Sequence, residues 1–289
     1  MLKIATLLTC HNRKEKTLNA MKTLYTALHN TSTEIKLDVY LTDDGSTDGT
    51  REEISKLYPE VIIIKGSGNL FWAKGMRKSW ENAQKKEYDM YFLLNDDVEL
   101  YPNVFEQILL THSYSLKTFN KSGVYIGATE DKNNHKLTYS GSVILNKFLY
   151  TQERLTPNGN FQQCDIANAN IMVVHNSVVE KIGILSGEYS HGVSDYDYSL
   201  RANKNNIPVL VVPEYCGHCE FDHKDIYEGF SEMSLKERKQ LLYSQKGLAY
   251  KSYTKYMRKF FPLRYPLVVF FGIFKLYFPK TYLKYIRRN

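Results

Sequence analysis

The sequence predicts an α/β protein in which a doubly wound parallel sheet is followed by a helical C-terminal extension. The first observation is that short, β-branched apolar runs alternate with segments of helical periodicity from the start of the chain, which is typical of βαβ units. The second is a change of composition near residue 235, after which the chain is basic, aromatic and helical in pattern. We therefore expect an α/β domain over residues 1–232 and a helical extension over residues 233–289.

Each expected element follows from its hydrophobic pattern. In the first half, strands are expected at residues 3–9, 35–42, 61–65 and 90–94, and helices at residues 14–29, 73–86 and 104–117. Residues 123–163 contain turn signals such as Pro157-Asn158-Gly159 and predict short strands and loops. The remaining elements are expected at residues 171–174 (strand), 176–182 (helix), 194–203 (helix) and 208–212 (strand), with helices beyond residue 231.

The composition limits the class of protein and its compartment. Of the 289 residues, 43% are hydrophobic and 24% are charged, which excludes a disordered or fibrous chain. Because the four cysteines are too few and too scattered for a disulfide scaffold, a reducing compartment, the cytoplasm, is expected. The N-terminus has a short apolar run without a small-residue cleavage site, so we expect a first strand there and no signal peptide.

The charge is divided unevenly along the chain. Residues 236–289 contain 14 Lys and Arg and one acidic residue, whereas the whole chain carries a net charge of +7. An acidic body with a basic, aromatic tail favours an anionic membrane surface as partner and argues against nucleic acid. The apolar stretch 265–274 has about half the length needed to cross a bilayer, so we expect it to lie at the surface. The alternative is a pair of helices that pack on the body with solvated cations.

Ligands of a parallel sheet bind beyond the carboxyl ends of its strands, so the polar residues that follow the expected strands are site candidates. These residues are Thr9-Cys10-His11-Asn12, Asp43-Asp44-Gly45-Ser46, Gly66-Ser67-Gly68-Asn69 and Asn95-Asp96-Asp97. The turn at Asp43 and Asp44 suits a nucleobase or ribose, because Asp accepts a hydrogen bond from an imide N–H and glycine permits close approach. The alternative is a helix start, since Thr50 and Glu53 have the spacing of a capping box.

Two further acidic segments indicate metal and acid–base chemistry. The adjacent carboxylates of Asp96 and Asp97 repel each other unless a cation or solvent relieves them, and Mg²⁺ or Mn²⁺ bound to a diphosphate needs only one or two carboxylates. The alternative there is a solvated acidic turn. In Ser194-Asp195-Tyr196-Asp197, one carboxylate could act as general base, and Arg201 could orient a phosphate or carboxylate. The alternative is an acid-rich first helical turn with a capping box.

The segment Cys216-Gly217-His218-Cys219, with His223 close behind, allows three interpretations. A structural zinc site would need a full ligand set, and the sequence has no second Cys-x-x-Cys. A single histidine, His218, at a metal–diphosphate site is favoured over zinc. A hydrogen-bonded structural histidine is the third possibility.

Six motifs occur in order between residues 3 and 220: TCHNR, DDGSTDGT, GNLFWAKGMR, LLNDDVEL, SDYDYSLRA and VVPEYCGH. Together they resemble the family 2 glycosyltransferases, which are inverting enzymes of the Rossmann-like GT-A fold. Asn95 stands in place of the first Asp of the family's DxD metal motif, as in members that resemble rhamnosyltransferases of polysaccharide synthesis. Ser194 stands where the family usually has Glu.

The resemblance implies a role for each residue that matches a family motif. The nucleotide base and ribose would be bound by Thr9, His11, Asn12, Arg13, Asp43 and Asp44. The donor sugar and diphosphate would contact Gly68, Asn69, Trp72, Lys74, Asn95 and Asp96. The metal, Mn²⁺ or Mg²⁺, would be held by Asp97 and His218. Asp195 would be the catalytic base, with Asp197 in support.

The implied reaction is a single displacement with inversion, in which a sugar moves from a UDP or dTDP donor to a saccharide hydroxyl. The tail suggests a lipid-linked acceptor and an enzyme peripheral to the inner face of the cell membrane, in cell-surface polysaccharide synthesis. Two alternatives stay open. A nucleotidyltransferase also uses acidic metal ligands, although no Gly-rich triphosphate loop occurs near the N-terminus. A catalytically inactive module that binds sugar nucleotides or glycans is favoured by Ser194.

Overall fold

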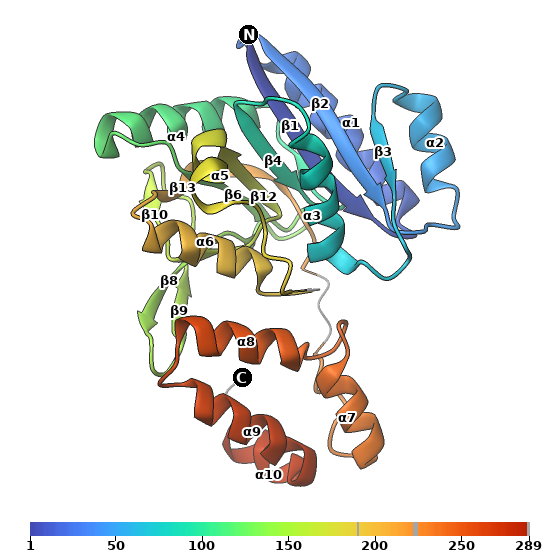
Figure 1. Ribbon diagram of the computed structural model, residues 1–289, viewed down its shortest axis with the longest axis vertical. Coiled ribbons are helices and arrows are strands. Elements are labelled where there is room, and N and C mark those ends of the chain that lie inside the picture. Colours follow the sequence, from blue (N-terminus) through green and yellow to red (C-terminus); the bar gives the residue numbers. More distant parts are fainter. Residues whose placement is uncertain (190, 222–224, 288–289) are drawn as a thin grey trace.

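The computed structural model describes residues 1–189, 191–221 and 225–287 and has a central sheet with helices on both faces (Figure 1). The last helices of the chain form a group at one end of the molecule, below the sheet in that view. The described part of the chain is therefore an α/β body with a helical C-terminal part, as expected.

The first half consists of βαβ units. Its elements are β1 (Leu2–Cys10), α1 (Lys14–Asn30), β2 (Ile35–Asp43), α2 (Thr50–Leu57), β3 (Ile62–Lys65), α3 (Phe71–Ala83) and β4 (Met90–Leu94). β1 pairs in parallel with β2 on one side and with β4 on the other, and β2 pairs in parallel with β3. This confirms the doubly wound parallel sheet. The helix start at Thr50 is also present, although no side-chain cap forms there.

The second half completes the sheet with a change of direction. Its elements are β5 (Glu99–Leu100), α4 (Val104–Phe119), β6 (Val124–Glu130), β7 (Leu137–Tyr139), β8 (Gly141–Asn146), β9 (Thr151–Arg154), β10 (Gln162–Gln163), β11 (Ile166–Ala167), β12 (Ile171–His175), α5 (Asn176–Ile182), α6 (Ser194–Lys204) and β13 (Val209–His218). The main sheet runs β10-β13-β6-β12-β4-β1-β2-β3, and β11-β8-β9 form a second sheet. β12 is antiparallel to β4, with Ile171 opposite Leu94. The turn before β12 therefore lies at the edge where β4 ends.

Two apolar clusters fill the space between the sheet and its helices. Side chains of α1, α2 and α4 pack on one face, and side chains of α3, α5 and α6 pack on the other. In the second cluster, the fully buried Trp80 contacts the rings of Tyr91 and Tyr198. Burial on both faces explains why the strands read as continuous apolar runs in the sequence.

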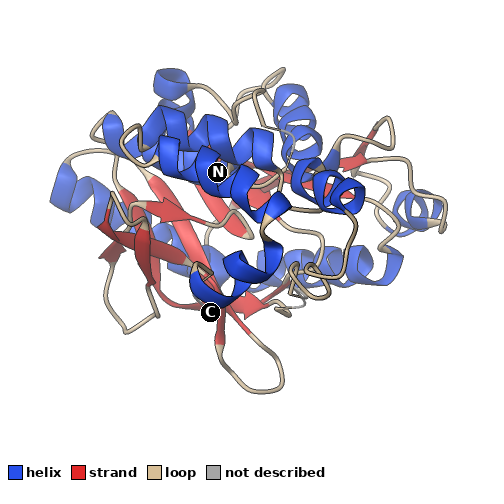
Figure 2. Cartoon of the chain, turned by 90° about the horizontal axis from the view of Figure 1, so that it is seen from below, coloured by secondary structure: helices blue, strands red, loops and turns tan. Residues whose placement is uncertain are grey.

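The C-terminal extension consists of α7 (Leu235–Tyr243), α8 (Tyr250–Phe260), α9 (Tyr265–Tyr277) and α10 (Pro279–Tyr285). A third apolar cluster, built around Tyr189, Tyr256, Met257 and Phe261, joins α8 to the body. Figure 2 looks from the side of the extension and shows helices in front of the strands. The alternative interpretation, in which tail helices pack on the body, is therefore met by α8, while the expected membrane contact stays a prediction.

Helix α9 packs closely on α8 because residue 272 is a glycine. A Cβ atom at Gly272 would lie 2.2 Å from the ring of Tyr250, whose hydroxyl donates to the carbonyl of Val269 at 3.1 Å. A larger residue at this position would clash with this ring, so that the ring or the helices would have to move. Among the residues that the structure describes, no helix has both the length and the apolar character needed to span a bilayer.

Candidate active site

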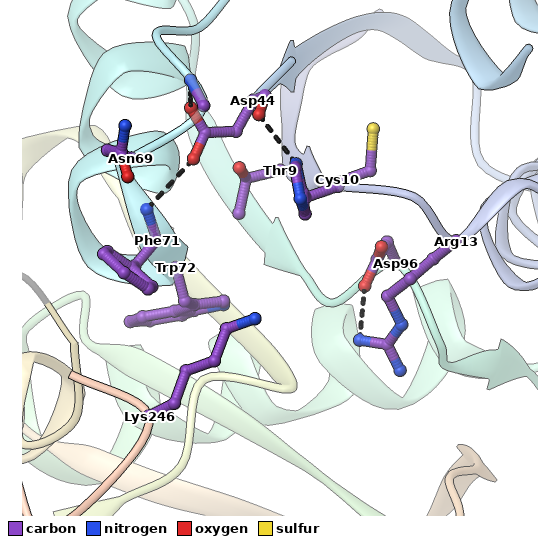
Figure 3. A pocket seen from close by; sticks show the side chains of 11 residues that line it. Thr9, Cys10, Arg13, Asp44, Asn69, Phe71, Trp72, Asp96 and Lys246 are labelled. Carbon is purple, nitrogen blue, oxygen red and sulfur yellow. Dashed lines mark hydrogen bonds and ion pairs between the residues drawn. The ribbon is translucent and has the colours of Figure 1, made fainter. Parts of the chain in front are cut away.

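A cavity of about 420 Å³ opens at the carboxyl ends of the central strands (Figure 3). It is lined by Thr9, Cys10, His11, Arg13, Asp44, Gly68, Asn69, Phe71, Trp72, Asp96 and Lys246. Eight of these residues were assigned a role from the sequence, and Cys10 was a site candidate without a role; the eight come from four separate strand ends. The fold thus brings together motifs that are far apart in the chain at the edge where α/β sheets bind ligands.

Hydrogen bonds join the turn after β1 to the turn after β2. The backbone amide of Asn12 donates to the Ser46 hydroxyl at 3.0 Å, and the Asn12 side-chain oxygen accepts from the Thr47 amide at 2.7 Å. Asn12 itself adopts φ 51°, a left-handed conformation that Asn tolerates better than most residues. Asn12 therefore fixes the turn after β2 at the rim of the site.

Asp44 holds the loop between β3 and α3. Its buried carboxylate accepts from the backbone amides of Gly68 at 2.8 Å, Leu70 at 2.7 Å and Phe71 at 3.1 Å. The carbonyl of Asp44 also accepts from the ring of His11 at 2.8 Å. These contacts give Asp44 a structural role that the sequence did not indicate, while its predicted contact with the nucleobase stays a prediction. The neighbouring Asp43 accepts from the amide of Ser46.

The first turn of α3 forms one wall of the cavity. The indole N–H of Trp72 donates to the side-chain oxygen of Asn95 at 2.7 Å, which ties this wall to the acidic turn after β4. α3 can approach β1 closely because residue 75 is glycine: a Cβ there would lie 2.2 Å from the Thr9 hydroxyl. Lys74, which was expected in this wall, is exposed on α3 and lies outside the lining.

Arg13 pairs with both acids of the turn after β4. Its guanidinium lies 3.1 Å from Asp96 and 2.5 Å from Asp97. Burial raises the pKa of Asp96 to about 7; the Arg13 charge opposes this rise and the Asp97 charge adds to it. The predicted repulsion between these carboxylates is thus relieved by a cation from the chain itself.

Asp96 and Asp97 fit a divalent cation that takes its other ligands from a diphosphate, because Mg²⁺ and Mn²⁺ prefer carboxylate oxygens. Within the described ranges, which leave out His223, no group of three or more His, Cys, Asp and Glu side chains is placed to hold a metal ion. The described chain therefore offers a short acidic cluster and no complete set of protein ligands. Among the described residues, Cys216, His218 and Cys219 do not form such a group, and His223 lies outside the described residues.

Among the described residues, His218 does not form a possible metal-binding group with Asp96 and Asp97. Its ring packs edge-on against Tyr101, with ring centroids 4.8 Å apart, and the Tyr101 hydroxyl donates to Glu130 at 2.5 Å. The thiol of Cys219 lies beside Asp97 instead, at 3.8 Å. The arrangement therefore matches the alternative of a structural histidine and does not support the predicted metal contact.

Asp195 lies in the first turn of α6 and is held by backbone amides. Its carboxylate accepts from Tyr196 at 2.9 Å and from Ala169 at 3.2 Å. Burial raises the pKa of Asp195 to about 6, and the two amides oppose this rise. Asn170 follows Ala169 in the chain, and its carbonyl accepts from the amide of Asn95. The turn at Ala169 and Asn170 therefore connects Asp195 to the acidic cluster. A carboxyl group with such a pKa suits a general base near neutral pH.

Asp197 and Arg201 bind each other and the C-terminal extension. The fully buried Asp197 accepts from Arg201 at 2.7 Å, from Lys259 of α8 at 2.6 Å and from Tyr189 at 3.1 Å. Arg201 also donates to two backbone carbonyls, and it does not line the cavity. Arg201 and Asp197 therefore have structural partners within the chain, and their predicted roles toward substrate and Asp195 stay predictions. Of the alternative interpretation of this segment, the acid-rich first helical turn is present and the capping box is absent, because Val193 is the N-cap and no side-chain cap forms.

Two lining residues were missed by reasoning from the sequence. Phe71 adopts φ 55°, a strained conformation for a bulky residue, and its amide is held by Asp44. Phe71 lies within the motif GNLFWAKGMR, which predicted part of the site. The sequence pattern around it, however, is the same as that around an aromatic residue of the core. Lys246 comes from the turn between α7 and α8, where no sequence signal distinguishes it from the other tail lysines.

Comparison with known proteins is consistent with this geometry. Residues 6–172 match the model of the family described as glycosyl transferase family 2. No curated protein matches the chain at a significant level. Among solved structures, the fold resembles TarS of S. aureus, with a TM-score of 0.54 and 12% identity over 99% of this chain and 76% of that one.

Two other similar structures were solved with ligands. GalNAc-T7 with UDP, GalNAc and Mn²⁺ has a TM-score of 0.56 and 15% identity, over 84% of this chain and 50% of that one. The mannosyltransferase PcManGT of Pyrobaculum calidifontis with GDP-Man and Mn²⁺ has a TM-score of 0.54 and 13% identity, over 96% and 71% of the two chains. At these identities the likeness concerns the fold, which is the GT-A fold expected from the motifs.

Proposed function

The chain belongs to glycosyl transferase family 2, and we propose that it transfers a sugar, with inversion, from a nucleoside diphosphate donor to a saccharide hydroxyl. The observation that carries the proposal is the cavity at the sheet edge, where three strand-end motifs meet the acidic cluster that follows β4. A carboxyl group with a raised pKa, Asp195, is connected to that cluster through one turn. These are the parts that a displacement at an anomeric carbon needs.

The proposed donor is UDP- or dTDP-linked, and its nucleotide occupies the cavity between the turns after β1 and β2 and the first turn of α3. This part of the lining combines the aromatic rings of Phe71 and Trp72 with polar side chains such as Thr9 and Asn69, which suits a base and ribose. Similar structures were solved with UDP and with GDP-Man, so guanine nucleotides belong in the test.

The residues that would hold a divalent cation are Asp97 and Asp96, after Arg13 has moved from them. When bound, Mn²⁺ or Mg²⁺ supplies positive charge that stabilises the leaving diphosphate. The side chain of Arg13 is 36% exposed, so it can move into solvent, and the bound cation would then compensate the charges of Asp96 and Asp97 in its place.

In the proposed reaction, Asp195 accepts the proton of the acceptor hydroxyl while that oxygen forms a bond to the anomeric carbon. The bond from the anomeric carbon to the donor phosphate oxygen breaks at the same time, and the nucleoside diphosphate leaves with the electron pair. Backbone amides of Ala169 and Tyr196 orient the carboxylate. Its pKa of about 6 keeps it ionised at neutral pH and makes it a stronger base than an ordinary Asp.

We further propose a lipid-linked acceptor and a position at the inner face of the cell membrane. The support is an apolar face of the extension, which consists of Leu263, Leu267, Phe270, Ile273, Tyr277 and Phe278, with exposed fractions from 39% to 80%. The exposed Lys280 and Lys284 follow it in the chain. The tip of the β8–β9 hairpin, including Phe148, is also exposed and is tied to α9 by Arg264 at 2.7 Å. Aromatic rings with flanking cations suit a headgroup layer.

The membrane proposal is tested with vesicles. The paired substitution Phe270→Asp and Ile273→Asp is expected to release the protein from vesicles that contain anionic lipid. Leu110→Asp, an equally exposed leucine on α4, is the matched control and should remain bound. Unchanged vesicle binding of the paired variant would contradict the proposed surface.

The activity is tested first by binding and then by turnover. UDP, dTDP and GDP are each added with and without Mn²⁺, and a ligand that binds the folded state raises the melting temperature. Release of nucleoside diphosphate from the matching sugar nucleotide, measured in wild type and in Asp195→Asn, then reports transfer or slow hydrolysis. Binding without any Asp195-dependent turnover would favour the inactive binding module. Release of pyrophosphate from a nucleoside triphosphate would favour the nucleotidyltransferase.

A further inference from the structure

Lys246 brings the C-terminal extension into the donor cavity. It lies in the turn between α7 and α8, and its side chain extends beside Trp72 into the cavity (Figure 3). Three backbone hydrogen bonds close this turn: Gly247 and Ala249 donate to the carbonyl of Ser244, and Leu248 donates to the carbonyl of Leu241. The turn is therefore a defined structure that presents one lysine to the site.

The helices on both sides of the turn are well defined. α7 begins with a complete capping box between Ser234 and Glu237. α8 is fixed to α6 by the ion pair between Lys259 and Asp197 and by the buried ring of Tyr256. The position of Lys246 is therefore fixed relative to α6, the helix that contains Asp195.

The charges that line the cavity single out Lys246. Asp44 is occupied by three backbone amides, and Asp96 is paired with Arg13. Arg13 is itself engaged by two carboxylates. Lys246 has no hydrogen bond, ion pair or ring contact with any residue that the structure describes, and its side chain is exposed to the cavity. It is the cation of the lining that is available to an incoming anion.

We propose that Lys246 binds the diphosphate of the sugar-nucleotide donor and stabilises the negative charge that develops on it as the sugar leaves. The inference rests on the proposed function, and it makes the extension part of the donor site in addition to its proposed role at the membrane. A lysine ammonium is a common point-charge partner of phosphate, and it acts strongly where water is partly excluded. A lipid-linked acceptor also carries phosphate, so the test must separate the two sources.

The test compares nucleotide binding by calorimetry in wild type and three variants. Lys246→Ala is expected to weaken binding of UDP, or of whichever of UDP, dTDP and GDP binds wild type best, by roughly tenfold. Binding of the corresponding nucleoside, which has no phosphate, should not change. Lys246→Arg keeps the charge and should restore most of the affinity. Lys239→Ala removes an exposed lysine of α7 that does not line the cavity, and it should behave like wild type.

Each other outcome has a definite meaning. Unchanged diphosphate binding in Lys246→Ala would overturn the inference and leave the proposed function intact. Equal weakening of diphosphate and nucleoside would also overturn it, because the lysine would then act through the shape of the turn. A higher KM for the acceptor with unchanged donor binding would assign Lys246 to acceptor phosphate and overturn the donor contact. If wild type bound no nucleoside diphosphate, the proposed function would fail together with the inference.

Discussion

Two clusters of acids and cations are connected to Asp195, and they differ in the number of cations for each acid and in the exposure of the acids. At the sheet edge, Arg13 pairs with Asp96 and Asp97, and its side chain is 36% exposed beside the cavity. Inside α6, Asp197 has no exposure and is held by two cations from two helices and a tyrosine hydroxyl. We call these the edge cluster and the buried cluster.

The difference shows why similar residue types serve different purposes. In the edge cluster one cation, Arg13, serves two carboxylates that repel each other, so these acids can take up a further cation such as a metal. A fully buried carboxylate must keep its partners, because an uncompensated buried charge is strongly destabilising. The buried cluster therefore holds the extension on the body, whereas the proposed transfer reaction depends on other residues.

The largest expected effect concerns Asp195, two residues before Asp197 on the same helix. Asp195→Asn removes the proposed base but keeps the size of the side chain, so turnover should fall by about 10²–10⁴-fold. Nucleotide binding and melting temperature should remain near those of wild type. Steady-state release of nucleoside diphosphate measures the loss. Turnover near the wild-type rate would remove Asp195 from the mechanism.

The edge cluster is tested by Asp97→Ala. This variant should lose the Mn²⁺-dependent part of nucleotide binding, and turnover should fall by roughly a hundredfold, because positive charge at the leaving diphosphate contributes several kcal/mol. Chelation of the metal in wild type should have a similar effect. Melting temperature without ligand should change little. A Mn²⁺ response that persists in the variant would place the metal elsewhere.

The raised pKa of Asp195 predicts how turnover depends on pH. Burial moves this pKa to about 6, so the carboxyl group is protonated, and inactive as a base, below that value. Turnover should therefore rise about tenfold per pH unit up to pH 6 and then level off, if proton acceptance limits the rate. A profile measured at saturating donor checks this. A midpoint near pH 4 would indicate a solvated carboxylate instead.

The buried cluster is tested by Lys259→Met, which removes one of the two cations of Asp197. Because Arg201 remains, the expected loss in free energy of unfolding is about 2 kcal/mol, with a fall in melting temperature of roughly 4 °C. Lys255→Met, an exposed lysine on the same helix, is the matched control and should change stability little. Equal melting temperatures in the two variants would show that the ion pair does not fasten the extension.

Local patterns in the sequence were enough to predict the body of the fold. Short apolar runs mark the strands, and the polar residues after them mark the ligand edge, because all parallel strands end at the same side of the sheet. Eight predicted site residues line one cavity for this reason, Arg13 and Asp96 among them. The same spacing of motifs identifies the family, which the family model confirms over residues 6–172.

Partners of individual side chains could not be predicted in this way. His218 was assigned to a metal from its motif, but the pairing of β13 with β5 places it opposite Glu99, and its ring packs on Tyr101. Arg201 was assigned to a substrate, but the chain around it supplies an acid and two carbonyl groups. Hydrogen-bond partners depend on where other elements lie, and residue type does not determine that.

The sequence by itself determined the α/β class, the ligand edge and the family, because these follow from periodicity and from motifs that lie within single strand ends. Only the tertiary structure decided that the basic tail packs on the body and contributes a residue to the cavity. The docking of α8 through Lys259 and Tyr256 is a long-range contact, and it places Lys246 in a cavity otherwise built from residues 9–96. Such contacts arise from packing between elements distant in the chain, and no local pattern encodes them.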